Sequence, residues 1–173
     1  MNRRQQGFSL IELLIVVAII LIIAAMAIPS LLHARIAANE ASAASSIRSV
    51  NTAEISYQTA YPSVGYAATL ANLGGPAPCN PSPTNACLLD NTLASASPGN
   101  GSKSGYVFLA TGLNPVNNVN TQYTVGASPL TYNMSGIRNF CANEDGIIRY
   151  NPGGSGSTPV NNAAACQSFT AMP

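Results

Sequence analysis

The chain has 173 residues, of which 47% are hydrophobic and only 8% are charged. Its formal net charge is +1, which argues against a broad basic surface for nucleic acid. The only histidine, His33, excludes a usual Ser-His-Asp triad, and no glycine-rich phosphate loop fits the sequence. The length favours one domain, and the composition predicts neither an enzyme nor a bound cofactor.

The N-terminal region combines a basic start with a long apolar segment. Sixteen residues, 13–28, carry neither a charge nor a hydrogen-bonding side chain. Counted from Phe8, a helical segment to Ile28 would measure roughly 31 Å, the thickness of a bilayer's hydrocarbon core. Arg3 and Arg4 predict a cytoplasmic N-terminus, so we expect everything after Ile28 outside the cytoplasm.

Several kinds of N-terminal segment fit this pattern. An ordinary signal peptide would be cut after Ala25-Met26-Ala27, and Arg3-Arg4 could belong to a twin-arginine signal. A plain membrane anchor is a further alternative. None of them accounts for Glu12, because an ionised carboxylate costs about 2.5–3.5 kcal/mol at the centre of a membrane helix, and less near its end.

The motif Gly-Phe-Ser-Leu-Ile-Glu at residues 7–12, followed by the apolar run, resembles the class III signal of type IV pilins and type II secretion pseudopilins. The resemblance implies that a prepilin peptidase cuts after Gly7 and N-methylates Phe8. Removal of this leader would leave five basic and six acidic residues. The helix from Phe8 to Ile28 would remain as the transmembrane and assembly element.

Glu12 acquires a partner in this interpretation. Cleavage frees an α-amine on Phe8, which places a cation and an anion at positions i and i+4 of one helix. The amine of one subunit can then meet Glu12 of a neighbouring subunit. Such a pair in a low-dielectric bundle sets register more than it adds stability, so we expect Glu12 to fix the stagger of assembly.

A second helical segment follows the apolar run. Pro29 either kinks the helix, as the resemblance to pilins implies, or ends it. The helical pattern resumes at Leu31 and runs to Tyr61, where Pro62 stops it. Residues at spacings of three and four predict a core-facing stripe, with Glu54 as its one charged member: Ala43, Ile47, Val50, Glu54, Tyr57 and Tyr61. Arg35, Glu40 and Arg48 lie off this stripe.

The region 62–104 reads as a variable loop with little regular structure. Residues 67–73 predict a short helix ended by Gly74, residues 87–94 a further helical turn, and residues 95–104 a loop. Residues 46–75 also resemble the segment that follows the anchor in type IV pilin-like proteins of Gram-negative bacteria.

The remaining sequence predicts a small antiparallel sheet of three to five strands, laid on the helix stripe. The expected strands are 106–110, bounded by Gly105 and Gly112, then 122–125, 130–134, 137–141 and 147–150. Residues 142–146 form a hairpin turn signal between the last two. Residues 151–173 are strand-poor. The predicted fold is therefore α+β and pilin-like, a long N-terminal helix packed on an antiparallel sheet.

The four cysteines are expected to form two disulfides in an exported chain, and three connectivities are possible. Chain order and the resemblance favour Cys79–Cys87 and Cys141–Cys166, the second bounding a C-terminal loop like that of type IV pilins. A zinc site is not expected. Calcium is a minor alternative suggested by the resemblance to pseudopilins, with Asp90, Glu144 and Asp145 as candidate ligands.

These features divide the chain into a leader (1–7), a transmembrane and assembly helix (8–28), the second half of the long helix (29–61) and a globular head (62–173). The predicted function is a structural, non-enzymatic subunit of a type IV pilus, stored as an inner-membrane precursor with a periplasmic head. An ATPase-driven assembly platform would polymerise it into an extracellular filament. A periplasmic type II secretion pseudopilin and a minor pilin are the alternatives. Motility, adhesion, DNA uptake and secretion all use this subunit design.

Overall fold

The computed structural model describes residues 8–173 and divides the chain into two units, one ending at Arg35 and one from Ile36 to Pro173. The long helix α1 (Leu10–Ala60) contributes residues to both units. The predicted helix from Phe8 to Tyr61 is confirmed to within two residues at each end. Each unit is described separately below.

The first unit is the apolar part of α1. Almost every side chain between Leu10 and Arg35 is exposed, including the large aliphatic ones. This segment is long and apolar enough to cross a membrane, and none of its most apolar stretch is buried in the protein. Pro29 lies inside α1, so the alternative of a helix that ends there is wrong, while a kink remains a prediction.

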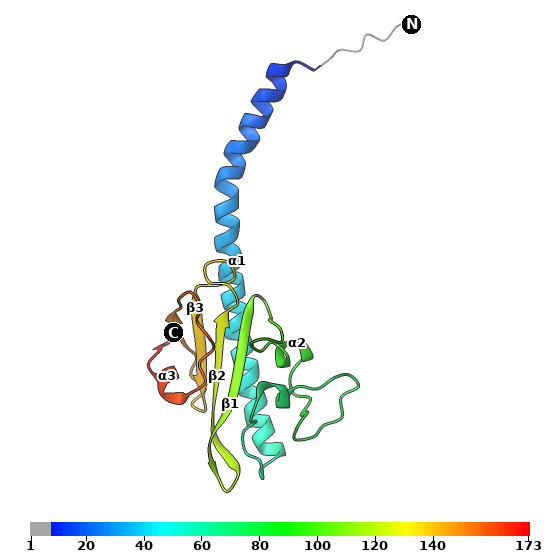
Figure 1. The fold of residues 1–173 in the computed structure, drawn as a ribbon, viewed down its shortest axis with the longest axis vertical. Helices are drawn as coiled ribbons and strands as arrows, with labels where there is room; N and C mark the ends of the chain where they lie inside the picture. The colour runs from blue at the N-terminus through cyan, green and yellow to red at the C-terminus, as the bar shows by residue number, and fades with distance from the viewer. Residues whose placement is uncertain (1–7) are drawn as a thin grey trace. The chain divides into compact units, whose positions relative to one another are not determined.

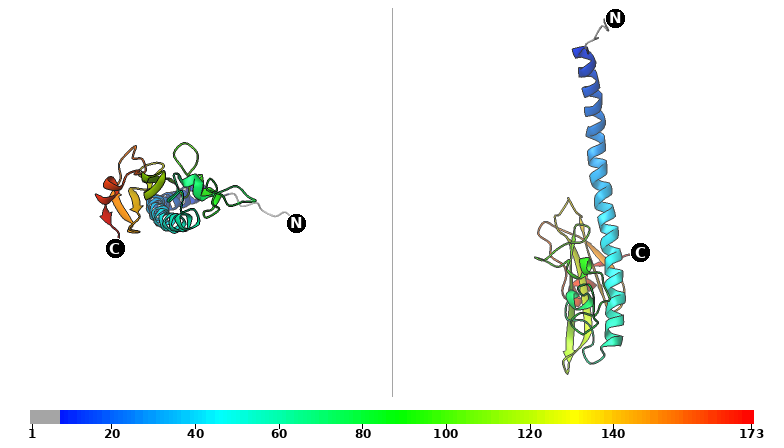
Figure 2. Two further views of the ribbon diagram at one scale, coloured as in Figure 1. Left: turned by 90° about the horizontal axis from the view of Figure 1, so that it is seen from below. Right: turned by 90° about the vertical axis from the view of Figure 1, so that its right-hand side faces the viewer.

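The second unit is a sheet of five antiparallel strands packed on the remainder of α1 (Figure 1). The strand order follows the chain: β1 (Tyr106–Val116), β2 (Val119–Pro129), β3 (Arg138–Asn143), β4 (Arg149–Pro152) and β5 (Thr170–Ala171). In the right-hand view of Figure 2 the strands run along one side of this part of α1. The predicted α+β architecture is confirmed.

The core of this unit lies between α1 and the sheet. The predicted stripe is buried from Ala43 to Tyr57, and Tyr61 is half-buried at its end. Large side chains from the strands meet it, among them Tyr106, Phe108 and Tyr123, none of which is more than 1% exposed. Aromatic side chains bury more apolar area than other residues, so these rings contribute strongly to this core.

Strands β1 and β2 form a hairpin that is longer than the sequence predicts. Each has eleven residues, and the register pairs Val116 with Val119 across a two-residue turn. Both turn residues, Asn117 and Asn118, have positive φ (51° and 65°), as a type I′ turn requires. The predicted end of the first strand at Gly112 is therefore wrong, since Gly112 lies inside β1 opposite Tyr123.

The predicted strand 130–134 is also wrong, because β2 continues to Pro129 and the chain then turns. The carbonyl of Thr131 accepts hydrogen bonds from the backbone of Met134 and from the backbone and hydroxyl of Ser135. Asn133 takes a positive φ of 61° in this turn. The apolar side chains of Leu130 and Met134, which suggested a strand, are exposed.

The short helices are smaller than predicted. Residues 67–73 contain only the 3-10 helix η1 (Leu70–Leu73), capped by Gly74, and residues 87–94 contain only α2 (Asn91–Ala94). The C-terminal region, predicted to be strand-poor, holds α3 (Ala163–Gln167) and the two-residue strand β5.

The C-terminal segment covers the face of the sheet that points away from α1. Gly126 of β2 allows this, because a Cβ there would lie 2.3 Å from the Val160 carbonyl oxygen. The seven residues from Tyr123 to Pro129 are all buried, which shows that β2 is covered on both faces. The second unit therefore has three layers: helix, sheet and C-terminal segment.

Candidate functional site

The motif of the first unit begins at the end of α1. Ser9 precedes the first helical residue, and its backbone N–H donates a 3.0 Å hydrogen bond to Oε2 of Glu12. The glutamate thereby makes its half of a Ser-x-x-Glu capping box, because it satisfies a backbone donor that the helix leaves unpaired. Glu12 thus caps the start of its own helix, and its carboxyl oxygens can still accept further hydrogen bonds.

The rest of the motif is exposed apolar surface or lies outside the described residues. Phe8 is 83% exposed, and Leu10, Ile11, Leu13 and Leu14 are each at least 60% exposed. Gly7, the predicted cleavage residue, lies outside residues 8–173, so cleavage stays a prediction. A helix that exposes this much apolar surface needs a lipid bilayer or other helices around it.

Glu40 joins α1 to the start of β3. Its Oε1 accepts hydrogen bonds of 3.0 Å from the backbone N–H groups of Ile137 and Arg138, and its Oε2 lies 2.6 Å from the Arg138 guanidinium. Only 5% of Glu40 is exposed. The prediction that Glu40 lies off the core-facing stripe is therefore wrong. Its burial depends on a cation 98 residues away in the sequence, which the helical pattern does not contain.

Glu54 is a second buried carboxyl, and it has no cationic partner among the described residues. Its Oε2 accepts a 2.9 Å hydrogen bond from the backbone N–H of Ala67, and its Oε1 is buried without a partner in residues 8–173. Burial raises the pKa of Glu54 from 4.5 to about 8, although the bond from Ala67 opposes the shift. At neutral pH this carboxyl is therefore mostly protonated and uncharged.

The cysteines form two disulfides, Cys79–Cys87 and Cys141–Cys166. These are the pairs that chain order and the resemblance favour. The second is fully buried and joins β3 to α3 of the C-terminal segment. The first closes an exposed loop between η1 and α2.

The three carboxylates considered for calcium do not form one cluster. Asp90 caps α2 by accepting from the Leu93 N–H, and it pairs with Lys103 at 2.9 Å. Asp145 pairs with Arg149, whose hydrogen bonds hold the pKa of Asp145 below its usual value. Across residues 8–173, no group of three or more His, Cys, Asp or Glu side chains could hold a metal ion.

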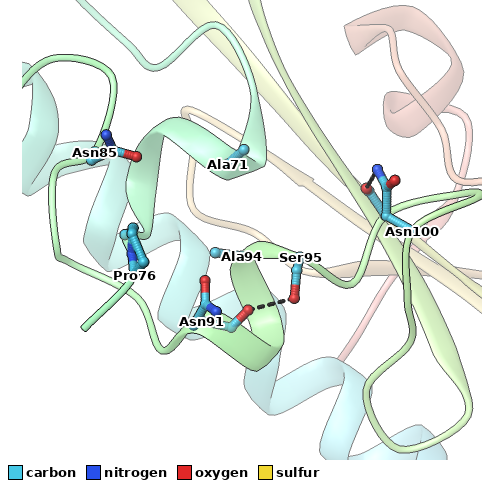
Figure 3. Close-up of a pocket in the computed structure, with 9 residues that line it drawn as sticks. Ala71, Pro76, Asn85, Asn91, Ala94, Ser95 and Asn100 are labelled. Carbon is cyan, nitrogen blue, oxygen red and sulfur yellow. Dashed lines mark hydrogen bonds between the residues drawn. The ribbon is translucent and has the colours of Figure 1, made fainter. Parts of the chain in front are cut away.

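A cavity of about 240 Å³ in the loop region of the head is lined by uncharged residues (Figure 3). It lies between η1, the disulfide-bonded loop and α2. The side chains of Asn85, Asn91 and Asn100 border it, and the Ser95 hydroxyl donates to the Asn91 carbonyl at 2.5 Å. None of the lining residues has an ionisable acidic or basic side chain.

The comparison with protein families agrees with the geometry of the N-terminus. Residues 2–28 match the family described as the prokaryotic N-terminal methylation motif. This class III signal peptide is typical of type IV pilins and type II secretion pseudopilins, and it implies a membrane precursor, processing by a prepilin peptidase and assembly into a pilus or pseudopilus. Combined with the long helix and its antiparallel sheet, it defines a type IV pilin-like structural protein. No curated protein matches the chain.

The ion pair between Glu40 of α1 and Arg138 of β3 was not predicted from the sequence. Glu40 was placed off the stripe, and Arg138 was counted only as a strand residue. A usable signal for Glu54 did exist, because it is the one carboxylate among the residues of the predicted stripe. His33 is exposed on α1, as expected for a histidine with no companion ligands.

Proposed function

We propose that this chain is the structural subunit of a type IV pilus, cut after Gly7, N-methylated at Phe8 and polymerised through the helix from Phe8 to Ile28. The methylation motif at residues 2–28 carries the proposal. The exposed apolar half of α1 supports it, because such a surface needs neighbouring helices once the subunit leaves the membrane. The function is assembly rather than catalysis.

The C-terminal region supports a pilin over its relatives. The buried Cys141–Cys166 disulfide ties α3 and the preceding loop to the sheet, and this arrangement resembles the disulfide-bounded loop of type IV pilins. Residues 62–104 and 151–173 would lie on the filament surface and set its adhesive properties. A type II secretion pseudopilin shares the methylation motif and is the alternative.

The assembly role of Glu12 follows from its position. Its carboxylate already accepts from the Ser9 N–H of its own chain and has further lone pairs for the Phe8 amine of a neighbouring subunit. Pro29 would allow the helix to kink between its membrane half and its head-bound half. Glu12→Ala is expected to abolish normal filaments while leaving the processed subunit in the membrane. Normal filaments from this variant would contradict the register role of Glu12.

Mass spectrometry of material sheared from the cell surface tests the function itself. A chain that begins at N-methylated Phe8, lighter by four hydrogen atoms for its two disulfides, is expected in a filament fraction. The same processed chain confined to the cell envelope would favour a pseudopilin or a minor pilin. A chain that begins at Ile28 would show that an ordinary signal peptidase had removed the helix, and would refute the proposal.

A further inference from the structure

The two disulfides of the head differ in their exposure to solvent. Cys141 and Cys166, which form the buried bridge, are each 0% exposed. In the exposed bridge, Cys79 is exposed and Cys87 is half-buried. An attacking thiolate must reach a sulfur atom directly to exchange with a disulfide. Of the two bridges, the exposed bridge alone meets this requirement in the folded head.

The closest neighbour of the exposed bridge on one side is a glycine. A Cβ added at Gly75 would lie 2.3 Å from Sγ of Cys79 and 3.6 Å from Sγ of Cys87. Gly75 thus has no side chain that could cover these sulfur atoms. The buried bridge is enclosed instead, because Cys141 lies in β3 between β2 and β4, and its partner lies in α3.

The exposed bridge also tethers the segment 76–81 to the head. All six residues of this segment are exposed, and no hydrogen bond reaches them from the part of the chain that the structure describes. The chain beyond the segment is held independently. The Pro83 carbonyl accepts a 2.6 Å hydrogen bond from the Tyr57 hydroxyl, and the Cys87 N–H donates to the Gly74 carbonyl at 3.0 Å. Cleavage of the bridge would therefore release 76–81 and leave Cys87 in place.

We propose that Cys79–Cys87 is a thiol–disulfide exchange site, which an external dithiol reduces while the head stays folded and the buried bridge stays oxidised. One thiolate of the dithiol attacks Sγ of Cys79, forms a mixed disulfide and displaces the Cys87 thiolate, which takes up a proton. The second thiolate of the dithiol then attacks the mixed disulfide and releases the Cys79 thiolate, which is protonated in turn. Two electrons pass from the dithiol, which becomes a disulfide, to the protein.

Reduction would change the loop surface of the head. Gly75 and Pro76 form part of the wall of the 240 Å³ cavity, which Asn85 borders from the part of the loop that stays in place (Figure 3). Release of the segment 76–81 would open this wall, so the cavity keeps its shape only while the exposed bridge is oxidised. The inference concerns the head alone and does not depend on filament assembly.

Graded reduction of the full-length chain in detergent micelles, with dithiothreitol as the dithiol, tests the site. Free thiols are blocked with N-ethylmaleimide at each step, and the chain is then unfolded, digested with trypsin and analysed by mass spectrometry. Cleavage after Arg48 and Lys103 gives one peptide with both cysteines of the exposed bridge. Cleavage after Arg149 separates Cys141 from Cys166.

The exposed bridge is expected to be reduced and blocked at least about tenfold faster than the buried bridge, which reacts only when the sheet opens. Repeating the reduction in urea is the control, because both bridges should react at similar rates once the head is unfolded. A chain blocked only at Cys79 and Cys87 is expected to keep a cooperative thermal transition, measured by circular dichroism.

Two variants matched in the number of cysteines removed give a second readout. Cys79→Ser/Cys87→Ser is expected to lower the Tm less than Cys141→Ser/Cys166→Ser does. The first pair closes a loop with a sequence separation of 8, against 25 for the second, and a shorter loop restricts the unfolded chain less. A larger fall in Tm for the first variant would show that the head depends on the exposed bridge, and would contradict the proposal.

Two outcomes of the reduction experiment would overturn the exchange site. The first is an equal rate of reduction for the two bridges in the folded chain. The second is loss of the thermal transition when the exposed bridge alone is blocked. Neither outcome bears on the proposed pilus function, which the mass of the sheared material tests separately.

Discussion

Glu54 predicts an unusual pH dependence for the stability of the head. Its folded pKa is about 8, against 4.5 for the unperturbed group. Below about pH 4.5 the carboxyl is protonated in both the folded and the unfolded chain. In that range it therefore does not change the free energy of unfolding as pH changes. Between about 4.5 and 8 the unfolded chain loses this proton while the folded head keeps it. The free energy of unfolding therefore falls as pH rises through this window.

The size of the effect follows from the same pKa difference. Each pH unit in the window lowers the free energy of unfolding by about 1.4 kcal/mol, or about 3 kcal/mol between pH 5 and pH 7.5. For a domain of this size, that corresponds to a fall of about 10 °C in Tm. Above about pH 8 the carboxyl ionises in the folded head as well, and its contribution levels off.

Glu54→Gln isolates this group, because glutamine keeps the shape and the acceptor for the Ala67 N–H but cannot ionise. The variant is expected to match the wild-type protein near pH 5 and to be more stable at pH 7.5, by up to about 3 kcal/mol. Thermal melts of the full chain in detergent micelles, followed by circular dichroism, measure this difference. A wild-type Tm that does not fall between pH 5 and pH 8, or an equal slope in both proteins, would refute the burial argument.

Three further predictions concern how the head is held together. Glu40→Ala removes the acceptor for two backbone donors and a guanidinium and is expected to cost about 3 kcal/mol in urea unfolding. Lys103→Met breaks a more exposed ion pair and should cost less than about 1 kcal/mol. Equal losses of stability in the two variants would contradict the larger value expected for Glu40→Ala. Gly126→Ala forces a Cβ against the Val160 backbone and should lower the free energy of unfolding by at least about 2 kcal/mol. Gly154→Ala is its control, because no atom lies within 4 Å of the added Cβ, and it should be neutral in the same assay. Replacing both cysteines of the Cys141–Cys166 disulfide by serine should cost about 3 kcal/mol, and an unchanged unfolding midpoint would show that the bridge is dispensable.

Local signals in the sequence predicted the helices and turns whose conformation is determined by neighbouring residues. The apolar run before Pro29 and the spacing of Ala43, Ile47 and Val50 define α1 and its buried face. The Glu-Asp-Gly turn separates β3 from β4 as expected. The turn at Asn117-Asn118 was a local signal too, but a pair of asparagines without glycine was not recognised as a type I′ hairpin.

Contacts between residues far apart in the sequence could not be predicted from local patterns. Glu40 reads as a surface residue of an amphipathic helix, and only the approach of Arg138 makes its burial possible. Gly126 reads as a weak point in a strand, but the missing Cβ admits the Val160 backbone and so allows the C-terminal segment to cover the sheet. The position of Asp90 also depends on a distant residue, because it pairs with Lys103 and does not join Glu144 and Asp145 in a metal-binding cluster.

The sequence by itself determined the class of this protein, because the methylation motif, the helix-capping Ser9-Leu10-Ile11-Glu12 segment and the apolar run are continuous in the chain. Their chemistry needs no partner from elsewhere in the fold. The tertiary structure alone decided which charges of the head are used internally and which remain free. An ion pair depends on the distance between two side chains, and that distance is set by the packing of α1, the sheet and the C-terminal segment rather than by spacing along the sequence.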